Sequence, residues 1–130
     1  MKRDNKKTGN RGEDLAAEYL VKKGYKIVER NFRTRFGEID IVCWDAQTLV
    51  FVEVKTKIGH DFGEPEDMFN KNKMGQVKRM GEVYMRTQEL KESKTQDEEK
   101  WGGLCRVDVV AVVLRENGEV EKLEHYQAVY

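Results

Sequence analysis

Two runs of mostly apolar residues, 36–44 and 48–56, predict a pair of antiparallel strands in this 130-residue chain. Both runs are rich in β-branched and aromatic residues and lack proline, as strands usually do. A turn centred on Ala46 and Gln47 would join them into a hairpin. One face of this hairpin is expected to carry only apolar side chains, at positions 39, 41, 43, 50, 52 and 54.

Apolar positions at helical spacing predict two helices, one from about Asn10 to residue 23 and one over residues 71–90. Gly24 is suited to end the first helix, because glycine readily adopts the left-handed conformation found there. Further strands are expected at residues 25–33, 104–114 and 120–129. The order helix, three strands, helix, two strands predicts an α/β fold with a mixed sheet flanked by helices.

Length and composition favour one domain, expected over residues 9–130 after a disordered basic tail of residues 1–8. No apolar run approaches membrane-spanning length and the start does not resemble a signal peptide, so no membrane partner is expected. Cys43 and Cys105 fall within expected strands and are interpreted as reduced core residues. These features favour a cytoplasmic protein.

Positive charge is concentrated near the start of the chain. The formal net charge is zero, yet residues 1–35 hold eleven Lys and Arg residues against five acids. A local excess of this kind favours binding to a phosphate backbone. A charged surface that is balanced by acids elsewhere explains the same count, and both interpretations stay open.

Acidic side chains interrupt the expected hairpin at its open end. Alternation puts Glu38 and Asp40 on one face of the first strand, and Glu53 and Lys55 on one face of the second. The expected turn places Asp40 opposite Glu53 and Glu38 opposite Lys55. Two facing carboxylates repel unless a cation lies between them. The pattern fits a divalent metal site with a lysine beside it, and it fits a structural set of Glu–Lys contacts across the two strands equally well.

Oxygen ligands from Asp40, Glu53 and the backbone carbonyl of Val54 would suit Mg²⁺ or Mn²⁺. Such an ion polarises a phosphoryl oxygen and lowers the pKa of a bound water. Lys55 could position that water or offset negative charge in the transition state.

Glu13 falls within the apolar stripe of the first expected helix, so its carboxylate could reach the sheet as a further ligand. Asn10 as N-cap with Glu13 three residues later fits a capping box equally well. Lys73, at the start of the second expected helix, could approach a substrate phosphate. Asp108 is interpreted as a buried, hydrogen-bonded structural carboxylate.

The spacing of Asp40 and Glu53-Val54-Lys55 resembles the PD-(D/E)XK nuclease superfamily, whose three-layer restriction-endonuclease-like fold has the same element order. Nearly the whole chain resembles the YraN-like family of uncharacterised bacterial proteins. The motifs that carry this resemblance are Gly9…Glu13…Ala16…Tyr19-Leu20, Gly37-Glu38-Ile39-Asp40, residues 51–57, Phe62-Gly63-Glu64-Pro65-Glu66, Lys73…Tyr84 and residues 106–110.

That family is related to archaeal Holliday-junction resolvases, in which a first-helix glutamate joins the Asp and Glu-x-Lys residues. The resemblance implies metal-site acids at Glu13, Asp40 and Glu53 and a catalytic lysine at Lys55. Candidate contacts to nucleic acid are Arg33, Arg35, Lys57 and Lys73. The chain departs from the superfamily pattern at Ile39, which replaces a proline, and at Lys57, where an arginine is usual and would hold phosphate bidentately.

The resemblance implies a Mg²⁺- or Mn²⁺-dependent endonuclease that hydrolyses DNA phosphodiester bonds, branched DNA included, and leaves a 5′-phosphate. RNA is not excluded as a partner. A non-catalytic nucleic-acid-binding module with a nuclease fold is the main alternative, because a fold does not establish an activity. A structural protein that binds another protein through its sheet edge is a third. Whether two chains pair as a homodimer is left open.

Overall fold

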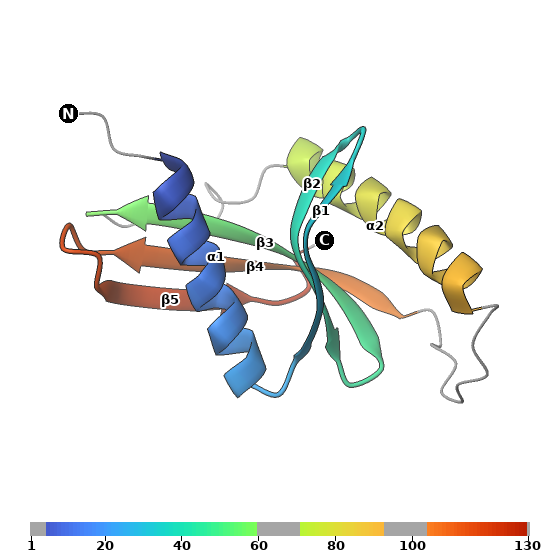
Figure 1. The fold of residues 1–130 in the computed structure, drawn as a ribbon, viewed down its shortest axis with the longest axis horizontal. Coiled ribbons are helices and arrows are strands. Elements are labelled where there is room, and N and C mark those ends of the chain that lie inside the picture. Colours follow the sequence, from blue (N-terminus) through green and yellow to red (C-terminus); the bar gives the residue numbers. More distant parts are fainter. Residues whose placement is uncertain (1–4, 60–70, 93–103, 130) are drawn as a thin grey trace.

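The computed structural model describes residues 5–59, 71–92 and 104–129, and within them the side chains of all but residues 5–9, 71–74 and 88–92. The described residues form two helices and five strands (Figure 1). In chain order these are α1 (Asn5–Lys22), β1 (Lys26–Thr34), β2 (Gly37–Asp45), β3 (Thr48–Ile58), α2 (Lys71–Glu92), β4 (Cys105–Leu114) and β5 (Val120–Tyr126). The predicted α/β class and element order are confirmed.

The strands form one mixed sheet in the order β1-β2-β3-β4-β5. Neighbouring strands are antiparallel except β3 and β4, which are parallel. The chain between those two includes α2, as a parallel connection requires a crossover. β4 is buried from Val107 to Leu114, which its nearly continuous apolar sequence predicts for a central strand.

Each face of the sheet is covered by one helix, which makes three layers (Figure 1). The α1 face is packed around Ala16, Leu20, Ile41, Val52 and Val110. The α2 face is packed around Val77, Tyr84, Val42, Phe51 and Val109. Sequence neighbours in β2, β3 and β4 thus divide between the two cores, because side chains alternate along a strand.

Glycine lets each helix lie close to the sheet. A Cβ atom at Gly12 of α1 would come within 1.8 Å of Thr56 Oγ1 in β3. A Cβ atom at Gly81 of α2 would come within 2.5 Å of the Phe51 ring, also in β3. The close approach at Gly12 matters for the site described below, because the next residue is Glu13.

Helix α1 begins earlier than the sequence predicts. It starts at Asn5 and takes in residues 5–8, which the sequence places in a disordered tail because they are polar and basic. Asn10 therefore lies inside the helix, so it is not the N-cap, and the capping box with Glu13 is wrong. The predicted stop is confirmed: Gly24 has φ 101° and donates its N–H to Val21.

The alternation predicted for β2 breaks at Asp40. Ile39 packs in the core on the α2 face, whereas Ile41 and Cys43 pack on the α1 face. The expectation that all three share one face is therefore wrong. Opposite the break, Asn31 of β1 has φ 56°, a left-handed conformation that interrupts regular strand geometry.

The two cysteines occupy different environments, and both are free thiols. Cys43 is buried, and its burial raises the pKa of the thiol to about 12. Cys105 is exposed at the start of β4, so its predicted place in the core is wrong. The reason is that burial in β4 begins at Val107, after the strand has entered the sheet. Neither α1 nor α2, in the part of the chain described, is long and apolar enough to cross a membrane.

Candidate metal centre

The candidate site lies where β2 and β3 separate. Their antiparallel ladder has the register predicted from the sequence and extends to the pair Ile41 and Val52. Beyond that pair, β2 continues beside β1 while β3 continues beside β4. Asp40 and Glu53 are the next residues of the two strands, so they lie at the point of divergence.

Asp40 reaches across this divergence to the backbone of β3. Its Oδ2 atom accepts a hydrogen bond of 2.8 Å from the backbone N–H of Val54. The contact holds one side of the carboxylate in place. The sequence predicted a role for the carbonyl of Val54, and the interaction that the structure shows is made by its N–H.

Three carboxylates gather at this point. Glu13 from α1 and Glu38 and Asp40 from β2 each place an oxygen within 4.8 Å of the other two. Two of the predicted metal-site acids, Glu13 and Asp40, are thus brought together. Glu38 completes the group, although the sequence placed it opposite Lys55 and did not predict it as a metal ligand. In the structure Glu38 lies opposite Arg33 of β1, and the two form an ion pair of 3.2 Å.

Glu53 and Lys55 lie beside the cluster of Glu13, Glu38 and Asp40, which is called the acidic cluster below. Glu53 is only 5% exposed, which is unusual for a carboxylate. Lys55 places its Nζ atom 3.7 Å from Glu53 Oε1. Glu53 is near enough to Glu13 to raise the pKa of that group. The predicted lysine therefore pairs with Glu53, within its own strand.

The pKa of Glu13 is raised by its burial and by its position among other acids. Burial raises its pKa, and the nearby carboxylates Glu38, Asp14 and Glu53 raise it further, while Arg30 opposes them. A carboxylate in this position is disfavoured in its ionised form. A cation among the acids would relieve the repulsion.

Asn31 is a member of the site that the sequence reasoning missed. With its NH₂ group toward the cluster, its amide donates to Glu38 Oε1 at 2.6 Å and to Glu13 Oε1 at 2.7 Å. This orientation is assigned because the opposite one would set the amide oxygen against two carboxylate oxygens. The available signal was an asparagine in the middle of a strand, since asparagine is the residue after glycine that best tolerates φ > 0.

The donor set suits a hard divalent cation. Mg²⁺ and Mn²⁺ prefer carboxylate oxygens and keep several waters, so three acids gathered between α1 and β2 fit either ion. Glu13 and Glu38 are half-buried, as is Asp40. A cation held there would remain open to a ligand from solvent.

Basic side chains lie on the β1–β2 hairpin beside the acidic cluster. Arg33 is 82% exposed, and Arg35 is exposed with its guanidinium 4.9 Å from the centre of the Phe36 ring. Arg79 of α2 approaches the same ring at 6.0 Å. Lys57 is exposed on β3. The side chain of Lys73 and the motif at residues 62–66 lie outside the described residues.

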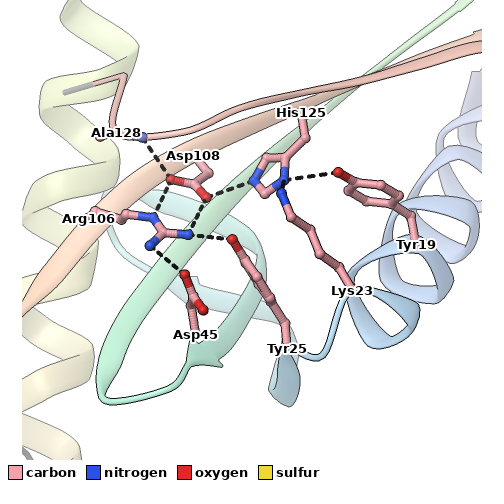
Figure 2. A network of polar contacts seen from close by, with 8 residues as sticks. All are labelled: Tyr19, Lys23, Tyr25, Asp45, Arg106, Asp108, His125 and Ala128. Atoms are coloured by element: carbon pink, nitrogen blue, oxygen red, sulfur yellow. Dashed lines mark hydrogen bonds and ion pairs between the residues drawn. The ribbon is translucent and has the colours of Figure 1, made fainter.

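A second polar network joins the C-terminal end of α1 to β4 and β5 (Figure 2). Asp108 accepts hydrogen bonds from Arg106, His125 and the backbone N–H of Ala128. Arg106 also donates to Asp45 and Tyr25. His125 is held from its other side by Lys23 at 3.1 Å and Tyr19 at 3.4 Å. Every polar group around Asp108 is thus engaged within the protein, as expected for a structural carboxylate.

Comparison with known proteins matches most of the chain to one family. Residues 12–112 match a family described as Uncharacterised protein family UPF0102. A UPF0102 protein of Syntrophomonas wolfei subsp. wolfei is 49% identical over 83 residues, which are 64% of this chain and 72% of that protein. One of Caldanaerobacter subterraneus subsp. tengcongensis is 38% identical over 127 residues, 96% of each chain. One of Dictyoglomus turgidum is 34% identical over 122 residues, 94% of this chain and 95% of the relative.

Proposed function

We propose that this chain, which belongs to the uncharacterised protein family UPF0102, is a Mg²⁺- or Mn²⁺-dependent endonuclease that hydrolyses phosphodiester bonds of DNA. The observation that carries the proposal is the gathering of Glu13, Glu38 and Asp40 within 4.8 Å, with Glu53 and Lys55 beside them. The resemblance of the Asp40 and Glu53-Val54-Lys55 pattern to PD-(D/E)XK nucleases supports it.

Each residue has a chemical role in this proposal. Glu13, Glu38 and Asp40 hold the cation, and the N–H of Val54 fixes the orientation of Asp40. A bound Mg²⁺ or Mn²⁺ supplies Lewis acidity, polarising the phosphodiester and lowering the pKa of a water.

Glu53 and Lys55 act beside the cation. Lys55, which is partly exposed, would donate to a phosphate oxygen and offset the negative charge that grows in the transition state. Glu53 keeps the ammonium group of Lys55 close to the acids and adds its own charge to the site.

DNA is proposed to approach over the β1–β2 hairpin. Arg33 and Arg35 are exposed side chains of this hairpin, and Lys57 and Lys73 are proposed to add phosphate contacts from β3 and α2. Branched DNA is included among the substrates, and RNA is a partner to be tested beside it. A homodimer would present two such sites to one junction, and light scattering of the purified protein measures whether it forms.

A substrate panel tests the function. Linear duplex, flap and four-way-junction DNA, with an RNA duplex beside them, are incubated with Mg²⁺, Mn²⁺ or chelator. The wild-type protein is expected to cut at least one DNA with either ion, and Asp40→Asn and Lys55→Ala proteins with an unchanged Tm are expected not to. Glu18→Gln is the matched control, because Glu18 is an exposed acid of α1 paired with Lys22. Absence of both cleavage and Mn²⁺ binding by calorimetry would rule the proposal out.

The exposed arginines favour one alternative, a non-catalytic module that binds nucleic acid. It predicts binding that survives Asp40→Asn but weakens when Arg33 and Arg35 are replaced by alanine. The nuclease predicts the same retained affinity for Asp40→Asn, but also that the wild type cuts the DNA and this variant does not. Measuring affinity and cleavage on the same DNA therefore separates the two.

A further inference from the structure

We infer that Asn31 is a positioning residue of the candidate metal site: its amide ties Glu13 of α1 to Glu38 of β2. The inference rests on the function proposed above and adds a residue to it. Asn31 donates hydrogen bonds of 2.7 Å to Glu13 and 2.6 Å to Glu38, from a third element of the fold. This side chain of β1 therefore sets the distance between the carboxylates of Glu13 and Glu38, which belong to a helix and a strand that share no backbone hydrogen bonds with each other.

The backbone at Asn31 is shaped for this contact. Pairing of β1 with β2 is regular on both sides, with Arg30 opposite Ile41 and Phe32 opposite Ile39. Between these pairs, Asn31 adopts φ 56°. This conformation costs most residues energy, and non-glycine residues kept in it cluster at functional sites. The irregular conformation of Asn31 coincides with the reversal of face at Asp40. Both residues of this break in the hairpin lie beside Glu13 and Glu38.

An amide suits the task better than a cationic side chain would. Its two N–H donors serve both carboxylates at once, which offsets part of their mutual repulsion. Because the amide is neutral, it holds the two carboxylates without adding positive charge to the cluster. The neighbouring arginines are engaged at the edges of the cluster, Arg30 with Asp14 and Arg33 with Glu38.

Three substitutions separate the side chain from the backbone. Asn31→Gly keeps access to φ > 0 and removes the amide. Asn31→Ala removes the amide and strains the backbone. Asn31→Asp keeps the shape but replaces the donor by a fourth carboxylate. Mn²⁺ affinity by calorimetry and Tm are measured for each, together with cleavage of whichever DNA the wild type cuts.

Asn31→Gly is expected to lose about 10–100-fold in Mn²⁺ affinity, the usual cost of losing a group that orients metal ligands, with little change in Tm. Asn31→Ala is expected to lose as much affinity and also to lower Tm. A glycine variant that binds Mn²⁺ as tightly as the wild type would show that only the backbone of Asn31 matters and would overturn the inference.

A spectroscopic measurement keeps the inference separate from the nuclease proposal. The side-chain NH₂ signals of Asn31 in a ¹H–¹⁵N spectrum are identified by their absence in Asn31→Gly. We expect them to shift in Glu13→Gln and in Glu38→Gln without any metal present, and to shift again on addition of Mg²⁺. If the wild type binds no metal, the proposed function fails, while the response to Glu13→Gln and Glu38→Gln still decides whether the amide bridges the acids. Signals that ignore both substitutions would refute the bridge.

Discussion

Asp108 shows how this protein keeps a charge in its interior. The side chain is fully buried, and burial by itself would raise its pKa. Hydrogen bonds from His125, Arg106 and the N–H of Ala128 outweigh that effect, so the pKa of Asp108 is lowered. Lys23 can only donate to His125 Nδ1, so the histidine hydrogen that faces Asp108 is on Nε2. The carboxylate stays ionised because both of its oxygens accept hydrogen bonds, Oδ1 from Arg106 and Ala128 and Oδ2 from Arg106 and His125.

Asp108→Asn is expected to lower the free energy of unfolding by about 3 kcal/mol or more at pH 7, measured by urea denaturation. The change removes the charge that balances half-buried Arg106 and sets an amide N–H against His125. Glu18→Gln, which breaks an exposed pair with Lys22, should cost about 0.5 kcal/mol or less. Equal losses in the two variants would contradict the structural role of Asp108.

The lowered pKa of Asp108 also predicts that the stability of the protein depends on pH. The folded pKa of Asp108 lies below its unfolded value of 3.8, so its ionised form stabilises the fold above that pH. This contribution is lost as the pH falls through the folded pKa. The difference in stability between wild type and Asp108→Asn should therefore shrink below about pH 4. Urea titrations at several pH values measure it.

Glu13 should behave in the opposite way, because burial and neighbouring acids raise its pKa. In chelator at pH 7, Glu13→Gln is expected to raise Tm, since the ionised carboxylate is disfavoured where it stands. The same substitution is expected to abolish Mn²⁺ binding. A gain in stability with a loss of metal affinity is the signature of a group retained for function. A lower Tm in chelator would indicate that Glu13 is structural.

At the scale of elements, the position of α1 decides where Glu13 lies. Gly12 is the contact point, since any side chain there meets Thr56 of β3 at once. Among the described residues, the ion pair that joins α1 to β1 near this point is the exposed pair of Arg30 with Asp14. The site is thus built by a close helix–sheet contact more than by charge pairing.

Gly12→Ala is expected to push the first half of α1 away from β3 and to weaken Mn²⁺ binding together with folding stability. Gly75→Ala is the matched control, because it adds the same methyl group to α2 where nothing lies within 4 Å. The control should raise the free energy of unfolding by about 0.5–1 kcal/mol, the usual gain for glycine to alanine in a helix. Chemical denaturation and Mn²⁺ calorimetry of both variants measure the contrast.

The sequence predicted the elements well where pattern and backbone agree. The turn at Ala46 and Gln47 determines the register of β2 and β3, and hydrophobic spacing identifies both helices. It failed where a local backbone change overrode alternation. The face of β2 reverses at Asp40, opposite Asn31 with its φ of 56°, and no pattern of polar residues predicts such a reversal.

The candidate site was predictable in part for the same reason. Asp40 and Glu13 come together as the pattern and the resemblance indicated. Glu38 was visible as a same-face acid, but its place beside Glu13 depends on how far β2 turns away from β3. Asn31 was missed because its role comes from contacts among α1, β1 and β2, which a linear pattern does not contain.

At the scale of the whole molecule, charge is unevenly distributed although the net charge is zero. The acidic cluster lies between α1 and β2, and exposed arginines lie on the hairpin of β1 and β2 beside it. A polyanion would be attracted to the arginines and repelled by the acids. A divalent cation at the acids removes that repulsion, so DNA affinity should rise with Mg²⁺ at constant ionic strength.

Salt dependence of DNA binding tests this arrangement. If Arg33 and Arg35 each contact a phosphate, replacing both by alanine should reduce the slope of log affinity against log salt by about 1.8, because each duplex contact contributes about 0.9. Lys122→Ala is the control: Lys122 is 45% exposed on β5, at the opposite edge of the sheet from β1. Fluorescence anisotropy with Ca²⁺ in place of Mg²⁺ would measure binding while limiting cleavage. A slope unchanged in the double variant, or lowered equally by Lys122→Ala, would show that DNA does not bind over the β1–β2 hairpin. The acidic cluster would then have to meet a phosphate from another side of the molecule.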